Sequence, residues 1–90
     1  MRQVHAIVHG KVQGVWFRAW TREMARETGV TGWVRNMPGH TVETLAQGSE
    51  EQLDRFMARL KHGPPLARVT EIHAERSDIE TPLPSFEVRG

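Results

Sequence analysis

The chain alternates two kinds of hydrophobic periodicity, and the order of that alternation restricts the possible fold more than any other feature. Apolar residues recur at helical spacing over residues 17–28, and again from Leu53 to Leu60. Shorter strand-like segments flank both, at 4–9, 30–36, 42–46 and 67–75. The resulting order, β-α-β-β-α-β, is the split β-α-β pattern of ferredoxin-like folds. Phe86 and Val88 indicate a short closing strand.

We therefore expect an α+β fold in one domain over residues 1–90, a ferredoxin-like α/β sandwich. Its antiparallel sheet, with a short extra C-terminal strand, is covered on one face by two helices. Local signals mark the boundaries. Gly29 is expected just past the first helix, and Ser49 with Gln52 has the spacing of a capping box. Val69 and Ile72, three residues apart, suggest a β-bulge in the fourth strand.

Composition excludes several classes of protein. The 90 residues contain no cysteine, which removes disulfides, thiolate metal sites and cysteine nucleophiles and favours a cytoplasmic setting. No apolar stretch approaches the roughly 20 residues of a membrane span. The net charge of +1, without a dense basic run, argues against a nucleic-acid partner. No large apolar patch is evident in the sequence, so we expect a monomer.

Topology predicts where functional residues should meet. A right-handed crossover through the first helix makes the first two strands parallel, so their C-terminal ends lie at one edge of the sheet. The loop 10–17, Arg18 at the helix start and Asn36 at the end of the second strand should therefore converge.

This strand–loop–helix segment has the features of an anion site. Glycines at 10 and 14 allow the loop to turn backbone N–H groups inward, and the helix dipole adds positive potential. Arg18 lies in the first helical turn, where a cation opposes that dipole unless an anion sits between them. The residues alone leave open the alternative that the glycines form only a tight turn and Arg18 is a solvated surface arginine. The Walker and G-x-G-x-x-G nucleotide motifs are absent.

Two motifs carry a resemblance to a known family. Residues 10–18 read G-K-V-Q-G-V-W-F-R and residues 32–36 read G-W-V-R-N, and both resemble signatures of the acylphosphatase family. The likeness covers essentially the whole chain. It implies hydrolysis of acyl phosphates to a carboxylate and inorganic phosphate, with no metal, cofactor or covalent intermediate. It also implies that Arg18 and loop amides bind the phosphate and that Asn36 orients the attacking water. The loop amides belong to Gln13, Gly14, Val15, Trp16 and Phe17.

The implied chemistry suits these residue types. The carboxylate leaving group needs no general acid, and phosphoryl transfer depends mainly on positioning and charge stabilisation. An asparagine is not a base at neutral pH, so we expect a phosphate oxygen of the substrate to take the proton. One departure from the family pattern is the turn at 37–40, Met-Pro-Gly-His, where an aspartate-glycine turn is frequent. His40 could then lie near the rim of the site.

Other interpretations have less support. The histidines at 5, 9, 40, 62 and 73 do not form a metal-ligand pattern, so we expect no metal site. An RNA-binding sheet would need aromatic residues on the first and third strands, where this chain has histidines, Thr41, Glu43 and Leu45. Trp20 and Trp33 are instead expected to pack, and Trp16 to lie at the site mouth. A module that binds phosphate without turnover is the rival from a different class.

Overall fold

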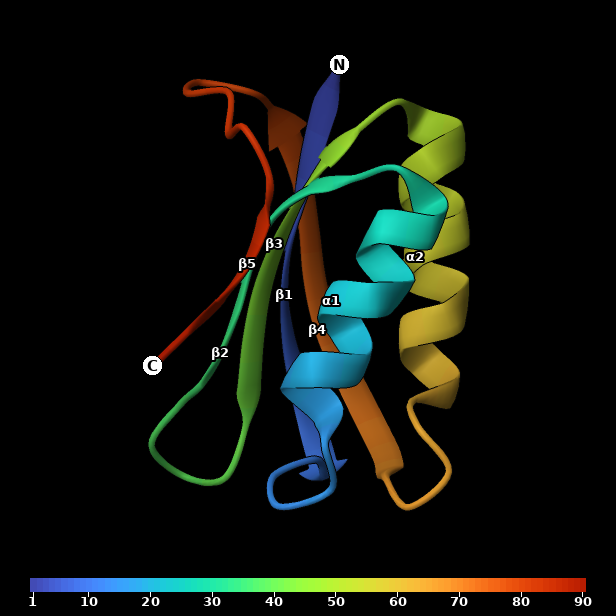
Figure 1. The fold of residues 1–90 in the computed structure, drawn as a ribbon, viewed down its shortest axis with the longest axis vertical. Coiled ribbons are helices and arrows are strands. Elements are labelled where there is room, and N and C mark those ends of the chain that lie inside the picture. Colours follow the sequence, from blue (N-terminus) through green and yellow to red (C-terminus); the bar gives the residue numbers. More distant parts are fainter.

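The computed structural model describes residues 1–90 and contains two helices and five strands (Figure 1). In chain order the elements are β1 (Arg2–Lys11), α1 (Phe17–Thr28), β2 (Thr31–Asn36), β3 (Val42–Gly48), α2 (Glu50–His62), β4 (Arg68–Asp78) and β5 (Phe86–Arg89). The expected element order and fold class are confirmed. The first helix has the predicted bounds, whereas β3 and β4 extend two or three residues beyond their predicted ends.

The strands form one sheet in the order β4-β1-β3-β2-β5. The β1–β3, β1–β4 and β2–β3 pairs are antiparallel, as expected, but β5 pairs with β2 in parallel. The parallel pair has a simple geometric cause. β5 starts from the end of the sheet where β4 stops, so it runs opposite to β4 and in the direction of β2. The sheet is therefore mixed at this one edge.

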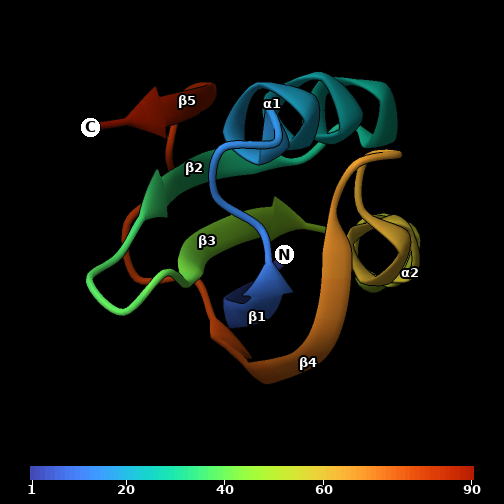
Figure 2. The ribbon, with the colours of Figure 1, turned by 90° about the horizontal axis from the view of Figure 1, so that it is seen from below.

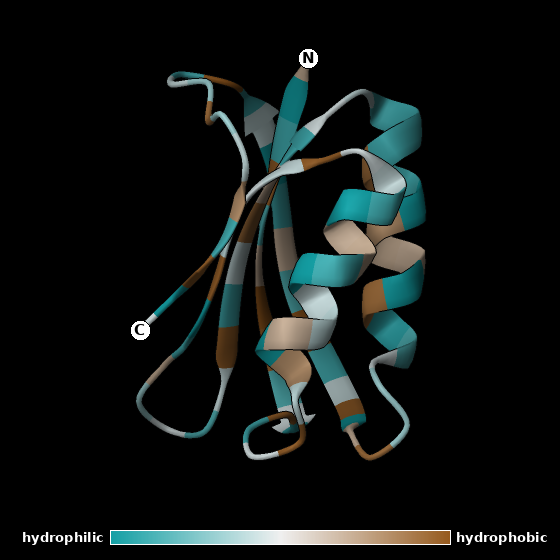
Figure 3. Cartoon of the chain, in the orientation of Figure 1, coloured by the Kyte–Doolittle hydropathy of each residue, from teal (hydrophilic) through white to brown (hydrophobic).

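Both helices lie on the same face of the sheet and enclose the core (Figure 2). α1 packs against β2 and β5, and α2 against β3 and β4. Alternate β1 residues, Val4, Ala6 and Val8, are fully buried beneath them. Each helix adds large buried side chains, among them Phe17 from α1 and Phe56 from α2. Hydropathy colouring shows the same division, with hydrophilic stretches along both helices and hydrophobic segments on the strands behind (Figure 3). Neither helix combines the length and the apolar character that a membrane crossing requires.

Two local predictions, a helix cap and a β-bulge, are confirmed. α2 begins with a capping box, in which Ser49 Oγ accepts from the Gln52 N–H and Gln52 Oε1 accepts from the Ser49 N–H. The register of β1 against β4 shifts between His9 and Gly10, where β4 carries one extra residue. At this bulge a Cβ on Gly10 would lie 1.9 Å from the Arg68 carbonyl oxygen, so no larger residue fits the close strand approach.

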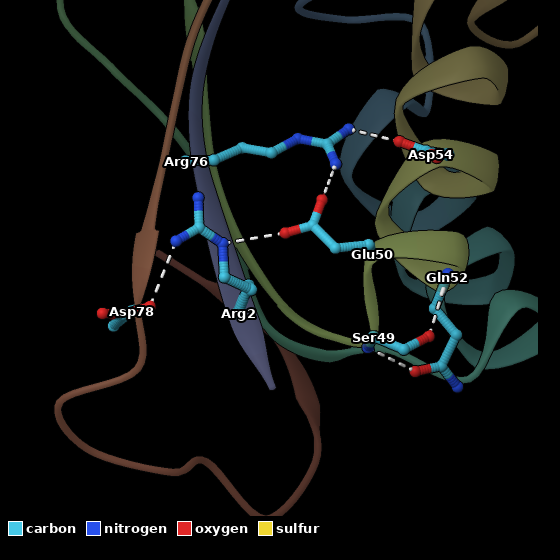
Figure 4. Close-up of polar contacts among 7 residues, drawn as sticks. All are labelled: Arg2, Ser49, Glu50, Gln52, Asp54, Arg76 and Asp78. Carbon is cyan, nitrogen blue, oxygen red and sulfur yellow. Dashed lines mark hydrogen bonds and ion pairs between the residues drawn. The ribbon is translucent and has the colours of Figure 1, made fainter.

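An ion network holds β1, α2 and β4 together near the start of α2 (Figure 4). Glu50 accepts from Arg2 at 2.8 Å and from Arg76 at 2.7 Å, and these residues also pair with Asp78 and Asp54. Hydrogen bonds from Arg76 and Arg2 hold the pKa of Glu50 below its usual range. The charged groups of this network are thus paired with one another.

Candidate active site

The loop between β1 and α1 and the turn between β2 and β3 lie at the same end of the sheet, at the bottom of Figure 1. An open cavity of about 560 Å³ is found here, between this loop, the first turns of α1 and the ends of β2 and β5. Its lining is formed by Val12, Gly14, Trp16, Phe17, Arg18, Ala19, Arg22, Asn36 and Val88. Arg18 and Asn36 thus line one cavity, as the topology predicted, although they are separated by most of α1 and β2 in the sequence.

The loop backbone turns sharply into α1. Gly14 and Trp16 both have positive φ, of 72° and 63°, and for tryptophan this conformation is strained. Trp16 is the N-cap of α1, and its side chain makes no capping hydrogen bond. The first turn of α1 also contains no acidic residue. The free N–H groups at this helix start are therefore available to an anion rather than satisfied by a side chain.

Gln13 anchors the loop to the neighbouring turn. Its Nε2 donates to the carbonyl oxygens of Met37 at 3.0 Å and Thr41 at 2.8 Å. Val15, between the two left-handed residues, is buried in the core. For Gln13 and Val15, only a role of the backbone amides was predicted. Their side chains fix the loop from two directions, and no local sequence signal indicates this role.

Arg18 is the second residue of α1 and carries an unpaired positive charge. Its Nη1 donates to the Arg89 carbonyl oxygen at 3.5 Å. It makes no ion pair with any carboxylate of the chain. The predicted closing strand is present as β5, but its part in the site was not predicted: β5 supplies this carbonyl and also Val88 in the cavity wall.

Asn36 ends β2 with an unsatisfied group. Its Oδ1 is buried and has no hydrogen-bond partner, and the same is true of only one other side-chain atom, Arg22 Nε. Both residues line the cavity. Because an unmade hydrogen bond to a buried polar atom costs about 1–3 kcal/mol, this pair of atoms marks the cavity as a site for a polar occupant.

The remaining predicted residues lie apart from the cavity or at its mouth. Trp16 is 80% exposed at the rim, whereas His40 does not line the cavity. Trp33 packs on the open face of the sheet, with the guanidinium groups of Arg35 and Arg89 about 5 Å from its ring centre. The rings of His9 and His73 are 5.1 Å apart, a proximity that the sequence analysis did not predict because it depends on the β1–β4 register.

Beside Asn36, the open face also carries a buried carboxylate. Glu43 accepts hydrogen bonds from His5 Nε2 and Arg35 Nε. Burial alone would raise the pKa of Glu43, but the hydrogen bonds from His5 and Arg35 outweigh it and lower the pKa below its usual range. This carboxylate is therefore engaged away from the cavity, and no acidic residue lines the cavity itself.

On this ferredoxin-like α+β fold, an uncapped helix start, an unpaired arginine and an unsatisfied asparagine meet in one small cavity. These are the features of a class of proteins that bind small anions. Comparison with known proteins narrows this class. The family model for acylphosphatase matches residues 4–88. The chain belongs to the acylphosphatase family, and its activity is the hydrolysis of acyl phosphates.

Individual relatives agree over nearly their full lengths. The chain is 44% identical to an acylphosphatase of Methylococcus capsulatus over 88 residues, covering 98% of this chain and 96% of that protein. It is 46% identical to an acylphosphatase of Nitrosococcus oceani over 86 residues, covering 96% of each. Among solved structures, acylphosphatase from Bacillus subtilis superposes with a TM-score of 0.97 at 36% identity, covering all of both chains. The resemblance drawn from the two sequence motifs is confirmed.

Proposed function

We propose that acyl phosphate hydrolysis takes place in the cavity at the start of α1, with Arg18 and Asn36 as catalytic residues. In this proposal Arg18 and the backbone amides of residues 13–17 bind the phosphate, and Asn36 orients water. The observation that carries the proposal is that Arg18 and Asn36 line one cavity beside a helix start without a side-chain cap.

Phosphate capture follows from the charges around the loop. The α1 dipole and free N–H groups favour an anion, and the Arg18 guanidinium can donate two parallel hydrogen bonds to phosphate oxygens. Arg18 forms no ion pair with a carboxylate of the chain, so phosphate binding does not have to break one. With a net charge of only +1, capture depends on these local groups rather than on the field of the whole molecule.

Asn36 suits the positioning of a water molecule. Its unpartnered Oδ1 can accept a hydrogen bond from water, which directs the water oxygen towards phosphorus. The water oxygen forms a bond to phosphorus as the bond from phosphorus to the acyl oxygen breaks. One proton of the water passes to a phosphate oxygen, so the products are a carboxylate and dihydrogen phosphate. The carboxylate leaves as a stable anion, so the mechanism requires neither a general acid nor a metal ion.

We also infer that the enzyme acts as a monomer in the cytoplasm, where its cysteine-free chain would be suited to a reducing environment. Its exposed large apolar residues, Met1, Trp16, Leu66 and Val88, do not form a run along the chain. Sedimentation equilibrium at micromolar concentration tests the monomer, and a mass of about twice 10.3 kDa would contradict it.

The test of the proposed mechanism is hydrolysis of benzoyl phosphate in excess chelator by the native protein and by Asn36→Ala. We expect native turnover to survive the chelator. Asn36→Ala should lower kcat about a hundredfold or more, as loss of a transition-state contact does, while inhibition by inorganic phosphate changes little. Arg26→Ala, an exposed change on the same helix, is the control and should match the native rate. If Asn36→Ala turned over substrate at the native rate, the water-positioning role would be wrong. A native protein that bound phosphate without turnover would favour the rival binding module.

A further inference from the structure

The cavity contains a second arginine that the proposed mechanism does not use. Arg22 lies on α1 one turn after Arg18 and lines the same cavity. Its Nε is buried and has no hydrogen-bond partner. The nearest carboxylate oxygen, Glu23 Oε1, is 3.7 Å from that Nε, which exceeds hydrogen-bond distance. A buried N–H donor without an acceptor indicates that the cavity accommodates an additional acceptor group beside Arg22.

The spacing of the two arginines gives the distance at which that group should lie. Residues four apart share a helix face and are displaced by about 6 Å along the axis. Arg18 is beside the loop amides, so Arg22 lies about one turn beyond the phosphate position. Two small apolar side chains, Ala19 and Val88, also line the cavity. They can contact a short carbon chain. No acidic residue lines the cavity, and Glu23, which lies outside the lining, is paired with Arg22 at 3.7 Å without a hydrogen bond.

We propose that Arg22 binds a carboxylate carried by the acyl group, so that the enzyme prefers acyl phosphates derived from short dicarboxylic acids. This inference rests on the proposed function, because it takes the phosphate to be held by Arg18 and the loop. The bridging and carbonyl oxygens of the acyl phosphate group lie directly beside the phosphorus, within the reach of Arg18. A terminal carboxylate two or three carbons away lies about one helical turn further along, where Arg22 is.

The test compares two substrates that differ only in charge, 3-carboxypropanoyl phosphate and its uncharged analogue 3-carbamoylpropanoyl phosphate. Native enzyme should hydrolyse the carboxylate substrate with a kcat/KM about tenfold or more above that of the amide, as expected for one charge-assisted hydrogen bond. Arg22→Gln should reduce this ratio to near one, and Arg22→Lys should retain part of it. Arg26→Gln, a matched change one turn further along α1, should leave the ratio unchanged. Raising the salt concentration should also lower the native ratio.

Binding without turnover provides a second readout. Competitive inhibition by 4-phosphonobutanoate should exceed that by butylphosphonate in the native enzyme, and Arg22→Gln should remove the difference. An equal loss for both substrates and both inhibitors would overturn the inference, because Arg22 would then act on the shared phosphate group. A native ratio near one would overturn it as well, and would leave the proposed function intact. Failure of the native enzyme to hydrolyse either substrate would overturn the proposed function and this inference with it.

Discussion

The two helices of this protein begin in opposite ways, although both pack on the same face of one sheet. α2 starts with a reciprocal capping box and with Glu50 and Glu51, which complement the helix dipole. α1 starts at Trp16 in a strained left-handed conformation, without a side-chain cap and with a cation in its first turn. The α2 start is therefore satisfied by its own chain, whereas the α1 start is not. A helix start left unsatisfied by the chain thus marks the place where a ligand supplies the missing charge.

The largest effect should come from the cation at the α1 start. We expect Arg18→Ala to lower kcat/KM for benzoyl phosphate about a thousandfold or more, because an arginine that offsets phosphoryl charge in the transition state is removed. Its free energy of unfolding should not fall, since a cation that opposes the dipole is lost. Steady-state kinetics and urea unfolding measure the two quantities. Near-native activity in this variant would show that the α1 start is not an anion site.

The loop that shapes the α1 start should be nearly as sensitive. Gln13→Ala removes both hydrogen bonds to the β2–β3 turn. Misplacement of the loop should lower kcat/KM about tenfold to a hundredfold. Gln3→Ala, which removes side-chain hydrogen bonds to Ser77 and Gln47 away from the cavity, serves as the control. If both glutamine variants lost the same activity, loop placement would not explain the effect.

At the α2 start we expect the reverse, a loss of stability without a loss of activity. Ser49→Ala removes the cap and should lower the free energy of unfolding by about 1 kcal/mol. In a domain of this size that corresponds to a fall in Tm of roughly 4–8 °C. Because the α2 start does not line the cavity, kcat and KM should stay at native values. Loss of activity without loss of stability would contradict the division between the two helix starts.

The smallest effect concerns the ion network at the α2 start. The pKa of Glu50 is lowered in the folded protein by Arg76 and Arg2. Its contribution to stability is therefore full above the unfolded-state pKa of about 4.3 and is lost as pH falls through the lower folded value. Glu50→Gln should make Tm less dependent on pH below about 4.3, as followed by circular dichroism between pH 3 and 7. If Tm of the variant depended on pH as steeply as that of the native protein, the network would contribute nothing measurable to stability.

The sequence predicted most of the fold because the deciding signals are local. The helix over 17–28, the capping box at Ser49 and the β4 bulge each depend on a few adjacent residues, and all three are present. The closing strand β5 was predicted, but its parallel pairing with β2 was not, because pairing direction depends on where the chain crosses the sheet.

The part of the site that depends on local signals was also predicted. Motif and topology identified Arg18 and Asn36, since both lie at element ends whose position follows from the crossover rule. The roles of the Gln13 side chain, of β5 and of Arg22 depend on contacts between distant segments. Arg22, in particular, is one of several arginines on α1, and only the helix face that borders the cavity distinguishes it.

The central claim is that the chain leaves the α1 start open to an anion and closes the α2 start. Titration of the protein with inorganic phosphate, followed by backbone amide NMR, tests it directly. We expect saturable chemical-shift changes of the amides from Gln13 to Ala19, with no change in those from Glu50 to Leu53. Equal shifts at both helix starts, or none near Arg18, would contradict it.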